Sequence, residues 1–163
     1  MKAIVSATAV ALSLIAGAAS AQAVRTEKNM SLELANQIAT ATVAACSASN
    51  YNVTVAVVDR AGTLRALQRA DNAGPHTVGA AQGKAFTSAS AKAPTSAMLE
   101  NVQKNPGAQT LVDIPGFLIL GGGVPVKVGN EVIGAVGVGG APGGHLDEQC
   151  ANAGIAKVAD LLK

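Results

Sequence analysis

The chain has 163 residues and a formal net charge of +2, with 13% of its residues charged and only 2% aromatic. Two Phe, one Tyr and no Trp offer few rings for stacking, which argues against carbohydrate binding and single-stranded nucleic-acid binding. The basic residues are scattered, so no positive footprint for DNA is expected. Low charge and abundant Ala and Gly instead predict large apolar faces, buried between the subunits of a homo-oligomer.

The first residues are typical of a secretory signal peptide. Met1-Lys2 gives a positive start, residues 3–18 are small and apolar, and Ala19-Ser20-Ala21 fits the small-x-small cleavage pattern. We expect cleavage after residue 21, with residue 23 as a second candidate, and a periplasmic or secreted mature protein. The apolar run is too short for a convincing membrane anchor, and no later stretch could span a bilayer. Residues 24–163 have the size of one domain.

The first half of the mature chain predicts a helix and a β-hairpin. Apolar residues recur three and four positions apart from Met30 to Cys46, and Ser31 is a candidate N-cap. The β-branched run Val53–Val58 predicts a buried strand. Asp59–Gly62 is a turn, after which Thr63–Arg69 is expected to return as the partner strand.

Three further helices are expected. The first, from Pro75 or His76 to Ala91, is unusual for its small side chains, which permit close approach of a backbone, a flat ligand or a second subunit. A shorter helix follows from Thr95 or Ser96 to Val102 or Gln103, after the break at Pro94. The last helix is predicted over Asp147–Leu162.

Three short apolar runs rich in Val, Ile and Leu predict strands at Phe117–Leu120, Val124–Val128 and Val132–Val138. Gly129-Asn130 joins the last two as a tight hairpin. Glycines strip the side chains from the last strand, which indicates either helix-on-sheet packing or the close approach of a ligand. The predicted fold is α+β, a five-stranded antiparallel sheet flanked by helices in the order α-β-β-α-α-β-β-β-α.

The two cysteines are candidates for a disulfide. Cys46 lies near the end of the first predicted helix and Cys150 near the start of the last, so antiparallel packing of these helices would bring them together. Disulfides persist in exported proteins. Such a bridge would contribute about 4–5 kcal/mol in the chain-entropy model. The alternative is two buried free thiols that pack as small apolar groups.

Eight segments, in this order, resemble the GlcG/HbpS family of haem-binding proteins over nearly all of the mature chain. They are Val57–Gly62, Arg69–Pro75, Lys84–Thr87, Ala93–Ser96, Asp113–Gly116, Gly121–Val126, Ile133–Val138 and Asp147–Gln149. The resemblance implies a profilin-like α/β sandwich, a multimer and binding of haem or a related tetrapyrrole. Haem breakdown or iron handling is proposed for relatives, and an exported member would look like an extracellular haem-binding protein.

Two features depart from the family pattern. The last strand ends Gly137-Val138-Gly139-Gly140-Ala141, without the Ser that the family often has there. Some exported relatives carry paired acidic residues in the long central helix that are linked with iron binding, whereas residues 78–82 here offer no carboxylate. Iron oxidation at that helix is therefore not expected. The resemblance does not place the haem-iron ligand on a residue of this chain.

Two histidines are candidate iron ligands. His76 follows Pro75 at the start of the long helix, where the helix dipole favours the neutral imidazole that ligates haem iron. His145 precedes the last helix, and the same argument applies. The alternative for each is an exposed histidine without a ligand. Two imidazoles are too few for a structural zinc site if the cysteines are bridged.

Other side chains could bind haem propionates or line the pocket. Arg69 could pair with a propionate or with Asp71. Lys84, two turns after His76, could bind a carboxylate or lie in solvent. Asp113 is expected to fix the Asp-Ile-Pro-Gly turn beside the pocket. Met98 could offer a thioether, although a core position is favoured.

These features give three functional hypotheses. The first is an exported haem-binding protein that sequesters, senses or helps to degrade haem, with the macrocycle in a slot between the small-residue helix and the glycine strands. The second is an enzyme or sensor acting on a small organic acid in the same groove, near Arg69 and Lys84. The third is a ligand-free assembly module. No nucleophile–His–carboxylate spacing and no phosphate loop is present.

Overall fold

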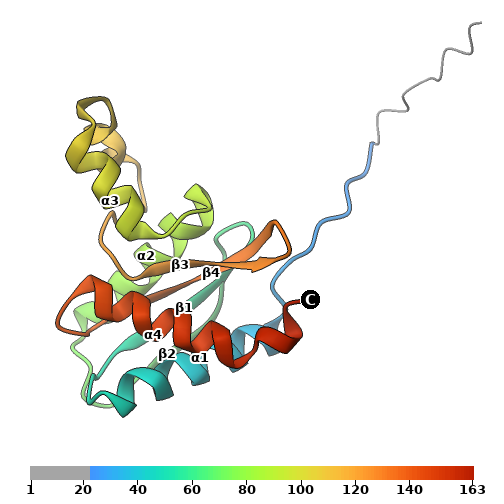
Figure 1. The fold of residues 1–163 in the computed structure, drawn as a ribbon, viewed down its shortest axis with the longest axis vertical. Helices are drawn as coiled ribbons and strands as arrows, with labels where there is room; N and C mark the ends of the chain where they lie inside the picture. The colour runs from blue at the N-terminus through green and yellow to red at the C-terminus, as the bar shows by residue number, and fades with distance from the viewer. Residues whose placement is uncertain (1–22) are drawn as a thin grey trace, which may run out of the picture.

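Four strands form an antiparallel sheet in the computed structural model, which describes residues 23–163. The order across the sheet is β2-β1-β4-β3, so the two hairpins meet at the centre, where β1 pairs with β4. The strands are β1 (Thr54–Asp59), β2 (Leu64–Arg69), β3 (Gly123–Val128) and β4 (Glu131–Gly139). All six residues of β1 are buried, since helices cover both faces of the sheet (Figure 1).

Helices lie on both faces of the sheet (Figure 1). On one face, α1 (Leu32–Ala48) and α4 (Gly144–Lys157) pack side by side; on the other, α2 (His76–Ala91) crosses β4, β1 and β3. The arm formed by α3 (Thr95–Lys104) and η1 (Pro106–Asp113) projects from the sandwich, at the upper left of Figure 1. A final short turn, η2, spans Ala159–Leu161.

The predicted signal peptide falls on residues 1–21, which lie outside the described residues, as does residue 22 of the second cleavage site. From residue 23 onward, none of the helices has the length and apolar character that crossing a bilayer requires. The α+β order of elements is confirmed, with one exception in the sheet.

The predicted fifth strand, Phe117–Leu120, is wrong: this segment is irregular and packs beside α2 and α3. Its backbone groups have other partners, because the N–H of Leu118 donates to Thr87 Oγ1 at 2.7 Å and the carbonyl of Leu120 accepts from Thr95 Oγ1 at 2.8 Å. A buried backbone group that is already paired has no need of a strand ladder. The sheet therefore ends at β3.

The contact between α2 and β4 explains why both elements carry such small side chains. A Cβ atom on Gly137 would lie 2.0 Å from the carbonyl oxygen of Ala81 and 2.5 Å from the backbone nitrogen of Ala85. The helix backbone thus rests directly on the bare strand, and Ala81, Ala85 and Ala89 pack with Val58 and neighbouring alanines of the sheet. The helix-packing alternative is correct, and the expected slot between helix and strand does not exist.

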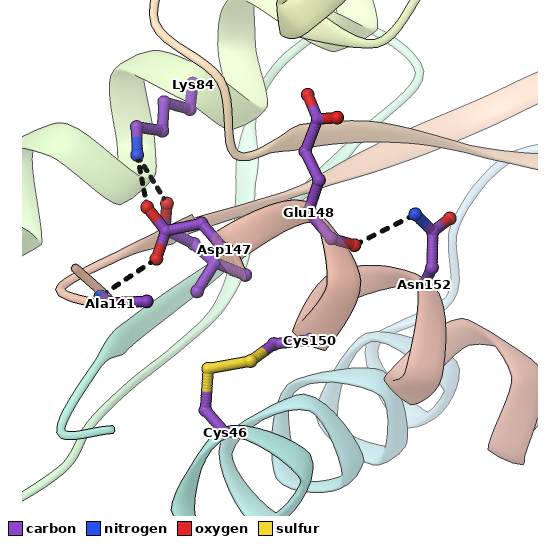
Figure 2. The surroundings of a disulfide bond; sticks show 8 residues. Cys46, Lys84, Ala141, Asp147, Glu148, Cys150 and Asn152 are labelled. Carbon is purple, nitrogen blue, oxygen red and sulfur yellow. Dashed lines mark hydrogen bonds and ion pairs between the residues drawn. A yellow bond between two sulfur atoms is a disulfide. The ribbon is translucent and has the colours of Figure 1, made fainter. Parts of the chain in front are cut away.

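The opposite face of the sheet holds the larger core. Valines and Ile133 from the sheet meet Ile38 and the alanines of α1 and α4. Here the predicted disulfide is confirmed: Cys46 near the end of α1 bonds to Cys150 on α4, with the two Cα atoms 5.3 Å apart (Figure 2). The predicted N-cap is confirmed as well, since Ser31 Oγ accepts from the N–H of Leu34 at 3.1 Å.

Candidate functional site

Two of the sequence-predicted site residues, Arg69 and His76, lie at the same end of the sheet. Arg69 ends β2, and its guanidinium donates to the carbonyl oxygen of Ala73 in the loop before α2. His76 is the first residue of α2, and its imidazole packs over Gly74. Both side chains are exposed. Thr77 holds the loop between them in place. Its hydroxyl donates to the Gly74 carbonyl and is 2.7 Å from the hydroxyl of Thr54 on β1.

Lys84 neither lies in solvent nor is free to bind a carboxylate of a ligand, the two environments expected from the sequence. It is 2% exposed, and its Nζ donates to Asp147 Oδ2 at 2.7 Å and to the carbonyl oxygen of Val138 at 2.9 Å (Figure 2). Asp147 is equally buried and also accepts from the N–H of Ala141 at 3.0 Å. The ammonium is therefore already paired with a protein carboxylate inside the sandwich, joining α2, β4 and α4.

Burial raises the pKa of Asp147 above its ordinary value. The hydrogen bond and the charge of Lys84, together with the Ala141 N–H, act against this rise, while the neighbouring charge of Glu148 adds to it. The pair thus carries a desolvation cost that its good geometry offsets only in part, as is common for buried ion pairs. Replacing only one of the two residues by an apolar one would leave the other as a single buried charge.

The next residue along, Glu148, holds the projecting arm. Its carboxylate accepts from the N–H and the hydroxyl of Ser96, at 2.9 and 2.8 Å, in the first turn of α3. It also accepts from the N–H of Gly122 at 3.3 Å. A carboxylate at a helix N-terminus satisfies donors that the helix itself cannot. The Asp147-Glu148 pair therefore anchors α2 with one carboxylate and α3 with the other.

The remaining candidates do not converge on one point. Asp113 is exposed at the end of η1, where the Asp-Ile-Pro-Gly turn begins. His145 is exposed in the first turn of α4 and packs over Gly143. Met98 is half-buried on α3. Within residues 23–163, no three side chains of His, Cys, Asp or Glu gather in a way that could hold a metal ion.

An apolar cleft of about 390 Å³ lies along one side of α2, where the helix borders the β1–β2 hairpin. Its floor is helix backbone: a Cβ atom on Gly79 would meet nothing within 4 Å. Phe86 forms one wall, held edge-on to Phe117 with the ring centroids 6.2 Å apart, and Leu64 is 43% exposed beside it. The lining residues are mostly small or apolar: Val58, Gly62, Leu64, Gly79, Gln82, Gly83, Phe86 and Gly116.

A second hollow, of about 320 Å³, has a polar lining and includes His76. It lies where the α1–β1, β2–α2 and β4–α4 loops meet, at the end of the sheet from which β1 starts. The apolar cleft and this polar hollow share no lining residue. His76 and Gly79 are nevertheless three residues apart on α2, and therefore neighbours on the helix surface.

Comparison with known proteins decides the family. The model of the family described as "Haem degrading protein HbpS-like" matches residues 30–156. The chain belongs to the HbpS-like family. Protein GlcG of Escherichia coli K12 is 39% identical to it over 109 residues, which cover 64% of this chain and 80% of GlcG.

Solved structures of relatives share the fold. A crystal structure of a double Glu-to-Asp mutant of Streptomyces reticuli HbpS superposes with a TM-score of 0.79 at 40% identity, covering 94% of this chain and 98% of that one. The crystal structure of a PduOC:heme complex superposes with a TM-score of 0.70 at 25% identity, covering 78% of this chain and 94% of that one. These structures share the layered arrangement around one antiparallel sheet.

Sequence reasoning missed three features of this HbpS-like chain. It did not pair Lys84 with Asp147, did not connect Glu148 with α3, and did not place a cleft over Gly79. A signal existed for the first two, because Lys84–Thr87 and Asp147–Gln149 are among the segments that carry the family resemblance. The small side chains are spread around α2, so the sequence pattern did not indicate which side of the helix faces the sheet. The cleft could therefore not be placed.

The buried ion pair gives a prediction about stability. Asp147→Leu or Lys84→Met alone should lower the free energy of unfolding by about 3–5 kcal/mol, because each leaves one unpaired buried charge. The double variant should lose far less than the sum of the two, since both charges are gone. Urea unfolding of the four proteins measures this coupling. Simple additivity of the two losses would contradict the role assigned to the pair.

Proposed function

We propose that this chain is an exported protein that binds haem or a closely related tetrapyrrole and sequesters it. The observation that carries the proposal is membership of the HbpS-like family together with an apolar cleft in the described structure. A relative with 25% identity and the same fold has been crystallised as a heme complex. The cleft supplies a place for an apolar macrocycle in this chain.

The outer face of α2 is the proposed binding surface. Because α2 rests directly on β4, a macrocycle has no room between them, and the cleft available to it lies beside the helix, next to the β1–β2 hairpin. There the bare backbone at Gly79 allows flat contact, while Phe86 and Leu64 offer apolar edges. The volume of about 390 Å³ falls within the range of small-molecule sites, which are concave and mostly apolar.

The residues that line the cleft provide no imidazole, thiolate or thioether for iron. We propose His76 as the axial ligand, since it lies one turn before Gly79 on α2 and neutral imidazole is a common haem ligand. His145, at the start of α4, is the second candidate. Arg69 is exposed near His76 and is proposed to meet a propionate. Lys84 has no part in this site, because its ammonium is buried against Asp147.

Export and assembly complete the proposal. The leader-like first residues and the Cys46–Cys150 disulfide both suit a periplasmic or secreted protein. Several large apolar side chains are exposed on and beside the projecting arm: Val112, Ile114 and Leu120. Exposed apolar side chains on and beside a projecting arm favour contact with another subunit, and we propose a homo-oligomer.

Haemin titration of the mature protein tests the binding site. The wild type should produce a protein-bound Soret band, and Gly79→Leu should weaken binding at least about tenfold by filling the cleft. The same change should leave folding intact or stabilise it by about 1 kcal/mol, because Gly is a poor helix former and a Cβ atom at this position meets no other atom within 4 Å.

Ala156→Leu, on the exposed side of α4, is the matched control and should bind haemin like the wild type. An unchanged haemin spectrum with the wild type would contradict haem binding itself. Haem binding that survives Gly79→Leu at full strength would instead contradict the location on α2.

Expression of the full chain in a bacterium tests export. The intact mass of the exported protein should correspond to a chain that begins at Gln22 or Val24 with both cysteines oxidised, and light scattering should give more than a monomer mass. Retention of residues 1–21 or free thiols would contradict export, and a monomer mass would contradict assembly.

A further inference from the structure

The polar hollow at the end of the sheet shares no lining residue with the apolar cleft and has the chemistry of a ligand site. Its walls come from three segments far apart in the sequence, which the antiparallel strands bring together at one end of the sheet. Five polar side chains line it: Asn50, Tyr51, Asn52, Asn72 and His76. We propose that this hollow binds a small carboxylate in the haem-free protein.

The backbone of the hollow is fixed before any ligand arrives. Gly140 has a φ of +128°, and a Cβ atom there would lie 2.5 Å from the carbonyl oxygen of Asn52, so the β4–α4 loop is pressed onto the α1–β1 loop. On the other side, Thr77 binds Thr54 and the carbonyl of Gly74. A preformed site loses less conformational entropy when a ligand binds.

The side chains in the hollow are available to a ligand. Of the polar side chains that line it, Thr77 alone has a hydrogen-bond partner within residues 23–163. Three amide groups, a phenol and an imidazole are therefore available to form hydrogen bonds with solvent or with a bound molecule. Surface polar groups of this kind are common one by one, but five around one concave space are the arrangement that orients a polar ligand.

The charge around the hollow favours an anion. No carboxylate is among the lining residues, although Asp71 is next to Asn72 and exposed. Two features add positive potential: Arg69, the last residue of β2, is held against this loop by the Ala73 carbonyl, and the positive end of the α2 dipole lies at His76. Amide, hydroxyl and imidazole N–H donors together with a nearby guanidinium are suited to carboxylate oxygens.

The chain carries its own reporters for this site. Tyr51 is the single tyrosine, and His76 is one of only two histidines. The other, His145, does not line the hollow and serves as an internal control. In proton NMR of the haem-free protein, succinate should shift the ring signals of Tyr51 and His76 and leave those of His145 in place, with a Kd of about 1 mM or tighter. Succinamide, which is uncharged, should bind much more weakly.

Asn72→Asp is the decisive variant. It adds a carboxylate to the rim, in a turn that accepts either residue, and should raise the Kd for succinate at least about tenfold through like-charge repulsion. Asn101→Asp, on the exposed surface of α3, makes the same change of net charge elsewhere and should leave the Kd unchanged.

Three results would overturn the proposal: no shift of Tyr51 at succinate concentrations well above about 1 mM, equal affinity for succinamide, or equal weakening by the two Asp variants. Haemin titration of Asn72→Asp separates this site from the haem cleft. Haem binding should persist in that variant while succinate binding is weakened, so the failure of one proposal can be distinguished from the failure of the other.

Discussion

The packing of the α2 backbone against the bare strand β4 is the contact on which the other features depend. Gly137 allows the Ala81 carbonyl and the Ala85 nitrogen to approach closer than any side chain would permit. The short distance brings the stem of Lys84 into the sandwich, where its ammonium reaches both β4 and Asp147. Because an unpaired charge at that depth would be costly, the position of α2 and the presence of Asp147 on α4 are physically coupled.

The same contact decides where a ligand can bind. With the inner face of α2 closed, one side of the helix borders the apolar cleft beside the β1–β2 hairpin, and its first turn borders the polar hollow. One helix therefore contributes to two neighbouring surfaces of opposite character, because His76 and Gly79 are about one turn apart. On the far side of the sheet, the disulfide and the contact of α1 with α4 hold the opposite layer in place (Figure 1).

Much of the fold could be predicted because local patterns agree with the final structure. Ser31 as an N-cap, the Gly129-Asn130 hairpin and the proximity of Cys46 and Cys150 follow from short-range chemistry. The fifth strand failed because Phe117–Leu120 has a strand-like composition, whereas its backbone bonds go to Thr87 and Thr95. Those partners are 25 and 31 residues distant in sequence, and no local pattern reports them.

The site was harder to predict for a related reason. Glycines in a strand are equally consistent with a ligand and with a helix, and only the packing of α2 decides between them. Lys84 has the same sequence signature whether it lies in solvent or in a buried pair. His76 and Arg69 were brought to one end of the sheet as their positions suggested, whereas Asp113 lies at the end of η1 and His145, at the start of α4, does not line the hollow that includes His76.

The most direct test of this account compares two glycine-to-alanine changes through the free energy of unfolding. Gly137→Ala should cost about 3 kcal/mol or more, because its methyl group would collide with the α2 backbone. Gly79→Ala, on the open side of the same helix, should stabilise the protein by about 0.5–1 kcal/mol. If Gly137→Ala were as stable as the wild type, there would be room between α2 and β4, and the placement of ligands outside the sandwich would be wrong.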